Sequence, residues 1–254
     1  MARQQIKDAV RRQFGAAASE YALAAVHISG ADLDCMLAAA GLTGGERLLD
    51  VGSGAGHSTL HFARAGAQIT GLDLTDEMVE TGRRLAADEG LANARFERGD
   101  AEDMPFANDA FDLVTCRQCA HHFADVPAAL REIRRVLRPG GRLLLCDSMA
   151  PEDDAQDAFY QQFEKLRDPS HVRGYRKSEW SSMLEAAGLA PELLGTWDLE
   201  IDFEDWIARM HTPPEKVTAL RELAGVAPPE VRERFRFTGR PGVFLIPIAV
   251  LLGR

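Results

Sequence analysis

The stretch RLLDVGSGAGH, residues 47–57, decides the fold. Its first five residues form a short apolar run with one acid, which predicts a buried strand over 47–51. Glycines follow at positions 52, 54 and 56, and glycine permits positive φ and a close approach of a ligand to the backbone. A helix predicted over 57–65 presents unpaired backbone N–H groups at its start. The strand, the glycine turn and the helix start together predict a nucleotide-binding corner.

The spacing of the glycines distinguishes two kinds of nucleotide. A dinucleotide-binding turn has the pattern G-x-G-x-x-G, and its third glycine would fall at position 57, where this chain has His57. With the acid before the turn, the stretch instead reads D-x-G-x-G-x-G. This pattern resembles motif I of the class I S-adenosylmethionine-dependent methyltransferases. The resemblance implies S-adenosylmethionine as cofactor, S-adenosylhomocysteine as product, and cofactor-binding roles for Asp50, Gly52, Ser53, Gly54 and Gly56.

Two further acids end predicted strands. Asp73 ends a strand predicted over 68–73 and lies 21 residues after Gly52, close to the offset of about 20 at which an acid meets ribose hydroxyls. Asp100 ends a strand predicted over 94–100. The following segment resembles the adenine-binding segment of the same family, G-D-A-x-x-L/M-P-F. By this resemblance the adenosine lies beside Leu74, Met78, Asp100, Ala101 and Glu102, although Glu102 also fits a solvated acidic turn.

The rest of the chain alternates between predicted strands and helices. Strands are predicted over 110–116, 142–147, 193–201 and 243–252, and Pro247 predicts that the last strand lies at an edge or carries a bulge. Such alternation requires a parallel sheet with helices on both faces. The run F-D-x-V…L-R-E-I-x-R-V-L-R-P-G-G-R-L again resembles class I methyltransferases, in their methyltransferase-11 or UbiE-like branch. We therefore expect an α/β fold with a Rossmann-like, seven-stranded, mostly parallel sheet and a helical cap.

We expect one methyltransferase domain over residues 1–254. Its core spans about 42–150, 177–201 and 240–254, and its cap consists of segments 1–41, 148–176 and 202–238. Asp32 and Ser178 are predicted helix N-caps. The segment that includes Tyr21, Val26 and His27 resembles the N-terminal segment of UbiE/BioC-like enzymes, which folds over cofactor and substrate. A helix that merely covers the edge of the sheet fits the same residues.

Composition excludes several classes of function. The net charge of −10 disfavours a nucleic-acid-binding surface, because phosphate neutralisation needs clustered Lys and Arg. The chain has no 18-residue apolar run and no secretory signal at its start, so we expect a cytoplasmic protein without membrane contact. Two of its four cysteines have C-x-x-C spacing, but no second such pair exists, which favours a structural role over metal or redox use. The expected partner is a small-molecule acceptor, with the chain as a monomer or homodimer.

Candidate catalytic residues follow the fourth predicted strand and lie in the cap. They are His121, His122, His171 and Arg173. Histidine suits the removal of a proton from a hydroxyl acceptor, since its pKa is near neutrality. Each histidine also fits a structural role, and Arg173 fits either an acceptor carboxylate or a surface acid. The family resemblance further implies that Cys116 and Arg117 lie near the methionine portion of the cofactor.

The residues after the fourth predicted strand disfavour two subclasses of methyltransferase. Cys116-Arg117-Gln118-Cys119 stands where amino-methylating nucleic-acid enzymes carry D/N-P-P-Y/F, and a metal-binding acid of the catechol type is missing there too. The sequence thus predicts metal-independent methyl transfer to a small molecule by in-line displacement, and leaves the acceptor and the methylated atom open. The alternatives are an NAD(P)-dependent oxidoreductase and a non-catalytic S-adenosylmethionine-binding protein.

Overall fold

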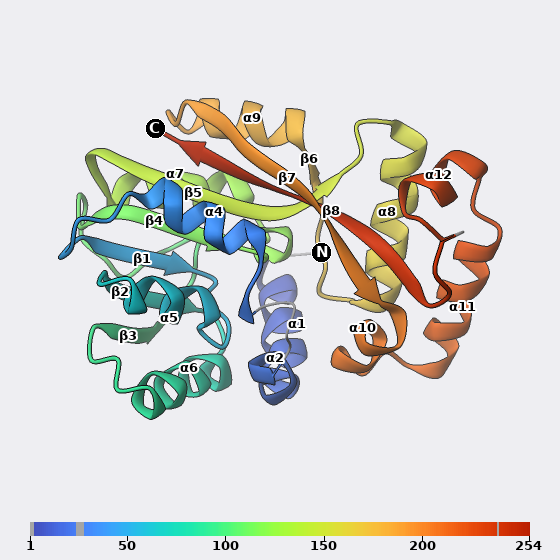
Figure 1. The fold of residues 1–254 in the computed structure, drawn as a ribbon, viewed down its shortest axis with the longest axis horizontal. Helices are drawn as coiled ribbons and strands as arrows, with labels where there is room; N and C mark the ends of the chain where they lie inside the picture. The colour runs from blue at the N-terminus through green and yellow to red at the C-terminus, as the bar shows by residue number, and fades with distance from the viewer. Residues whose placement is uncertain (1–2, 24–27, 238) are drawn as a thin grey trace.

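The computed structural model of the protein describes residues 3–23, 28–237 and 239–254 (Figure 1). Val26 and His27, which belong to the resemblance of the N-terminal segment, lie outside the described residues. In the described part of the chain, the strands form one sheet in the order β3-β2-β1-β4-β5-β8-β7, and the short β6 pairs with β5. The strands are β1 (Arg47–Val51), β2 (Gln68–Asp73), β3 (Ala94–Arg98), β4 (Phe111–Arg117), β5 (Leu137–Ala150), β6 (Tyr175–Arg176), β7 (Pro191–Asp202) and β8 (Val243–Gly253).

The sheet is mostly parallel. β3, β2, β1, β4 and β5 run in one direction, whereas β8 is antiparallel to both of its neighbours, β5 and β7. This topology confirms the predicted fold class of a seven-stranded Rossmann-like sheet with an additional short strand. Because the parallel strands end along one edge, the residues that follow β1, β2, β3 and β4 meet there.

Helices cover both faces of the sheet because successive strand residues alternate between the faces. Leu49, Leu143 and Leu145 face a core shared with α7 (Val126–Val136) and α9 (Lys177–Ala186). Leu48 and Leu144 face the opposite core, which is shared with α4 (Ala31–Ala40) and α5 (His57–Arg64). Helix α6 (Asp76–Asp88) packs beside β2 and β3. Two buried layers therefore hold the glycine turn after β1 from both sides.

Beyond the carboxyl ends of the strands lie the remaining helices. The long strands β7 and β8 extend to α8 (Asp154–Arg167), α10 (Phe203–Arg209), α11 (Pro214–Gly225) and α12 (Pro229–Arg234), on the right of Figure 1. These elements share an aromatic core that includes Phe159, Phe163, Trp206 and Phe244. Helices α1 (Arg3–Ala16) and α2 (Ala18–Leu23) lie between this group and α6. Both helical groups thus flank the edge where the predicted site residues converge.

Three local predictions were wrong. Helix α4 has Gly30 at its N-cap, and Asp32 instead forms a buried ion pair with Arg117 at 2.6 Å, since a buried guanidinium requires a counter-charge. Helix α9 begins at Lys177, and Ser178 Oγ donates to Glu152 instead of capping the helix. Strand β8 lies between two strands and not at an edge, and Pro247 is tolerated because the pairing with β5 ends one residue away, at Ile248.

One helix that was assigned to the cap packs on the sheet. Helix α4 falls within the segment 1–41 that the sequence assigned to the cap, yet it packs on the face of the sheet through Leu33 and Met36. The division itself stays a prediction. In the described residues, no helix is long and apolar enough to cross a membrane.

Candidate active site

The glycine turn after β1 is tied to the end of β2. Gly52 and Gly54 have φ of 68° and 52°, a region that glycine adopts without strain. The N–H groups of Gly52 and Ser53 both donate to the carbonyl of Leu72, at 2.8 and 3.0 Å. A Cβ at position 52 would lie 2.8 Å from the Cβ of Cys119. The turn is therefore held in one conformation, and a side chain at position 52 has no room.

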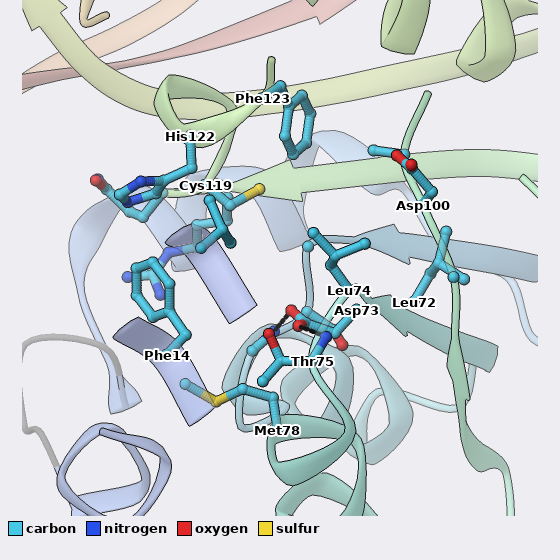
Figure 2. A pocket seen from close by; sticks show the side chains of 18 of the residues that line it. Phe14, Leu72, Asp73, Leu74, Thr75, Met78, Asp100, Cys119, His122 and Phe123 are labelled. Carbon is cyan, nitrogen blue, oxygen red and sulfur yellow. Dashed lines mark hydrogen bonds between the residues drawn. The ribbon is translucent and has the colours of Figure 1, made fainter. Parts of the chain in front are cut away.

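A cavity of about 1010 Å³, its open mouth included, lies above this turn (Figure 2). Its walls come from α1, α2, the ends of β2 and β3, and the segment after β4. Twelve residues predicted from the sequence line it, namely Tyr21, Gly52, Ser53, Gly54, Asp73, Leu74, Met78, Asp100, Ala101, Glu102, Arg117 and His122. In Figure 2, Asp73 and Leu74 lie between Asp100 on one side and the facing rings of Phe14 and His122 on the other. We call this space the first cavity.

Asp73 anchors the floor of the first cavity. Its Oδ2 accepts from the N–H of Gly54 and its Oδ1 from the N–H of Thr75, both at 2.9 Å. Burial raises the pKa of Asp73, while these backbone hydrogen bonds act in the opposite direction. A carboxylate has about four lone-pair sites, so each oxygen keeps acceptor capacity for a ligand hydroxyl.

One buried hydroxyl group at the first cavity is unpartnered. Ser53 Oγ has no hydrogen-bond partner within residues 3–23, 28–237 and 239–254. Ser53 and Thr75 both line the cavity, and the side chain of Thr75 interacts with the carboxylate of Asp73. Buried polar groups normally have partners, so Ser53 Oγ indicates that a polar ligand completes the site. A nucleoside with a polar tail fits this donor and acceptor set.

A lysine for which the sequence predicted no role lies at the opposite end of the first cavity. Lys7 of α1 forms ion pairs with Asp100 at 2.6 Å and with Glu102 at 2.8 Å. Burial lowers the pKa of Lys7, but its hydrogen bonds and charge interactions with these acids outweigh burial and raise it. No local pattern relates Lys7 to Asp100, because 93 residues separate them. The pair links α1 to the strand end that the sequence assigned to adenine.

Three predicted cofactor-binding residues lie beside the first cavity and do not line it. Asp50 is buried beneath it and accepts hydrogen bonds from Thr59 and Thr115, both at 2.7 Å. Burial, which outweighs these bonds, raises the pKa of Asp50 to about 6. Gly56 is the N-cap of α5, and Cys116 lies in the core with its Sγ 3.3 Å from that of Cys119.

A second cavity of about 660 Å³ adjoins the first. Phe14, Tyr21, Gln118 and His122 line both cavities and so form the boundary between them. The remaining walls come from β5, α8, β7, α10 and β8. Only the tertiary fold brings these elements together, and no pattern in the sequence indicates this space.

His121 lines the second cavity. Its Nδ1 lies 2.6 Å from Asp147 Oδ1, and Asp147 Oδ2 accepts from the N–H of His121 at 3.1 Å. Burial by itself lowers the pKa of His121, but the charge of Asp147 and the hydrogen bond to it dominate and raise the pKa. With Nδ1–H donating to the carboxylate, Nε2 carries the lone pair. His121 is thus an oriented imidazole at the wall of a cavity.

The other candidate catalytic residues differ in position. His122 lies at the boundary of the cavities, and burial together with the neighbouring His121 lowers its pKa to about 4. His171 is buried and lines neither cavity, and burial lowers its pKa as well. Arg173 also lines neither cavity, because it forms ion pairs with Asp157 and Glu179, each at 2.9 Å.

Within the described residues, no group of three metal-ligating side chains is arranged to hold a metal ion. The four cysteines are free thiols.

Comparison with known proteins gives relatives over almost the whole chain. The family model described as a methyltransferase domain matches residues 49–145. The uncharacterized methyltransferase YcgJ of Bacillus subtilis is 40% identical over 232 residues, which cover 90% of this chain and 92% of YcgJ. The ubiquinone/menaquinone biosynthesis C-methyltransferase UbiE of Vibrio vulnificus is 33% identical over 135 residues, which cover 52% of this chain and 50% of UbiE.

Two crystal structures share the fold. That of YcgJ from Bacillus subtilis superposes with a TM-score of 0.83 and covers 87% of this chain and 97% of its own. A protein from Bacillus halodurans, described as a candidate methyltransferase, is 38% identical and superposes with a TM-score of 0.84. That match covers 89% of this chain and 99% of the Bacillus halodurans chain.

Proposed function

The chain belongs to the methyltransferase-domain family, and we propose that it transfers a methyl group from S-adenosylmethionine to a small-molecule acceptor. One observation carries the proposal. Asp73, Asp100 and the unpartnered hydroxyl group of Ser53 converge on the first cavity. Membership of this family also favours methyl transfer over the nicotinamide-dependent alternative.

The proposed cofactor contacts follow from the positions of these groups. Asp73 would accept from the ribose hydroxyls and Asp100 from the adenine amine, while Ser53 and the glycine turn would face the methionine portion. When bound, S-adenosylmethionine supplies a methyl carbon that the positive charge on sulfur activates for in-line displacement. The chain therefore has to align the acceptor and exclude water, and no metal ion enters this proposal.

The second cavity is the proposed place of the acceptor. Phe14, Tyr21 and His122 line both cavities, so an acceptor in the second cavity lies next to a cofactor in the first. For an acceptor that must lose a proton, we propose His121 as the general base, because Asp147 orients its ring and leaves Nε2 free to accept the proton. The buried and neutral His122 would contact the acceptor and not remove its proton.

Equilibrium titration and a transfer assay together test this function. We expect the purified protein to bind S-adenosylhomocysteine saturably. We also expect it to form S-adenosylhomocysteine as a product when S-adenosylmethionine is supplied together with a phenol, quinol or hydroxy acid that it accepts. Tight binding of NAD with no response to S-adenosylmethionine would contradict the proposal. Saturable cofactor binding without transfer to any acceptor of a broad panel would favour the non-catalytic alternative. The cytoplasmic location and the monomeric or dimeric state stay predictions.

A further inference from the structure

The second cavity has an apolar wall. Leu199 and Ile201 of β7, Ile246 of β8 and Trp206 of α10 line it on the side away from the first cavity. The rings of Phe14 and Tyr21 line the boundary. The cavity extends over about 660 Å³, open solvent at its mouth included. The body of a ligand in this cavity is therefore apolar or aromatic.

Charged side chains interrupt this apolar wall. Glu164 and Arg167 of α8 and Arg209 of α10 line the cavity, and each is at least nine-tenths buried. Arg167 stacks over the ring of Trp206 at 4.8 Å, and its Nε donates to the carbonyl of Trp206. Two guanidinium groups thus border a cavity otherwise suited to apolar ligands. Burying such charges without a partner is costly, so they require an explanation.

Two atoms of this group lack hydrogen-bond partners in the described part of the chain. They are Glu164 Oε1 and Arg209 Nε. The nearest acid to Arg209 is Asp205, whose Oδ2 lies 3.6 Å from Nε, beyond hydrogen-bond distance, and whose side chain is 64% exposed. Leaving such a buried group unsatisfied is costly, and a ligand that pairs with it would recover this cost. The unpartnered atoms indicate that the ligand carries polar atoms at this end.

The charged side chains at the second cavity indicate the net charge of its ligand. Burial raises the pKa of Glu164, with Arg167 acting against it, so the acid is a weak counter-charge for two arginines. The two other acids close to the cavity are already bonded, Asp147 to His121 and Asp168 to Ser170. With Glu164 ionised, the lining groups carry one positive charge in excess. A monoanion such as a carboxylate neutralises the charge that remains when Glu164 is ionised.

We propose that the second cavity binds the acceptor as a small organic carboxylate with an apolar or aromatic body, and that Arg167 and Arg209 hold the carboxylate. This inference rests on the proposed function, because it names the class of acceptor for the same site. A planar guanidinium matches a planar carboxylate with paired hydrogen bonds. The carboxylate then anchors one end of the acceptor, and the apolar body lies against the apolar wall of the cavity.

Binding of matched probes tests the inference. The probes are benzoate, its neutral isostere benzamide and the dianion phenyl phosphate, each titrated into the protein saturated with S-adenosylhomocysteine. We expect benzoate to bind at least tenfold more tightly than either of the others, a difference of about 1.4 kcal/mol. Equal affinity for benzamide, tighter binding of phenyl phosphate, or no benzoate binding in the millimolar range would overturn the inference.

Variants of the two arginines give a second test. Arg209→Gln and Arg167→Gln should each weaken benzoate binding at least tenfold, about 1.4 kcal/mol. Arg209→Lys should weaken benzoate binding less than Arg209→Gln, because lysine keeps the positive charge. The control is Arg221→Gln, since Arg221 is an exposed arginine of α11 that pairs with Glu204. Unchanged benzoate affinity in both glutamine variants would overturn the inference.

Affinity for S-adenosylhomocysteine separates this inference from the proposed function. Neither arginine lines the first cavity, so folded variants should bind S-adenosylhomocysteine as the wild type does. Failure of the wild type to bind it would contradict the proposed function. Retained cofactor binding without a preference for benzoate would contradict only the assignment of the acceptor.

Discussion

Replacement of Asp73 by alanine gives the most direct test of the first cavity. The carboxylate already accepts from the N–H groups of Gly54 and Thr75, which leaves about two of its four lone-pair sites for ligand hydroxyls. A hydrogen bond to a charged group contributes about 1.5–3 kcal/mol. Loss of one bond should therefore weaken binding about tenfold, and loss of two, at about 3 kcal/mol, more than a hundredfold.

Isothermal titration with S-adenosylhomocysteine measures this effect of Asp73→Ala. The substitution also removes the two backbone contacts of the carboxylate, so the thermal midpoint of the variant has to be recorded beside its affinity. Asp103→Ala is the matched control, because Asp103 is an exposed acid after the same strand as Asp100 and does not line the cavity. A folded Asp73→Ala variant with wild-type affinity would refute the assignment of Asp73 to the ribose.

Three further predictions test the base, the buried ion pair and the glycine turn. Asp147→Asn removes the charge that raises the pKa of His121, so the acid limb of the profile of kcat/KM against pH should move to lower pH, and the plateau of kcat/KM should fall. An acid limb at the wild-type pH would rule out His121 as the base. Asp32→Ala removes the carboxylate that pairs with the buried Arg117 and should cost about 3–5 kcal/mol in urea unfolding. Burial raises the pKa of Asp32, but the interaction with Arg117 outweighs burial and lowers this pKa. The loss of stability in Asp32→Ala should therefore be full at neutral pH and should shrink as the pH falls below the ordinary carboxyl pKa. A loss of stability that does not depend on pH would contradict this pairing. Gly52→Ala forces a Cβ onto a cysteine side chain at positive φ and should abolish S-adenosylhomocysteine binding in calorimetry, whereas wild-type binding would show that the turn can shift.

The parts of the fold that the sequence predicted well are those set by neighbouring residues. Strands β1 and β2 have the predicted bounds, because each is a short apolar run that a glycine turn or a strand-end acid terminates. Asp125 caps α7 through an equally local contact, because its side chain accepts from the N–H of Ala128 three residues later. Asp73 and Asp100 reach the same cavity because the carboxyl ends of parallel strands share an edge.

Pairings between distant segments could not be predicted from the sequence. Lys7 meets Asp100 across 93 residues, and Asp32 meets Arg117 across 85. In the sequence, Asp32 is an acid before a helical run, which is the ordinary mark of an N-cap. Its actual role depends on a buried arginine at the end of β4, and only the packing of α4 on the sheet brings the two together.

The arginines Arg173 and Arg209 show why the proposed acceptor site could not be predicted from the sequence alone. Arg173 and Arg209 each have an acid a few residues away in the sequence, and only Arg173 was predicted as a candidate. Arg173 meets two acids at 2.9 Å and has no charge to spare for a ligand. Arg209 has one exposed acid at 3.6 Å and lines an apolar cavity with an unpartnered Nε. The capacity to bind an anion therefore depends on which acids the fold leaves out of reach, and that is a property of the packing between α8 and α10.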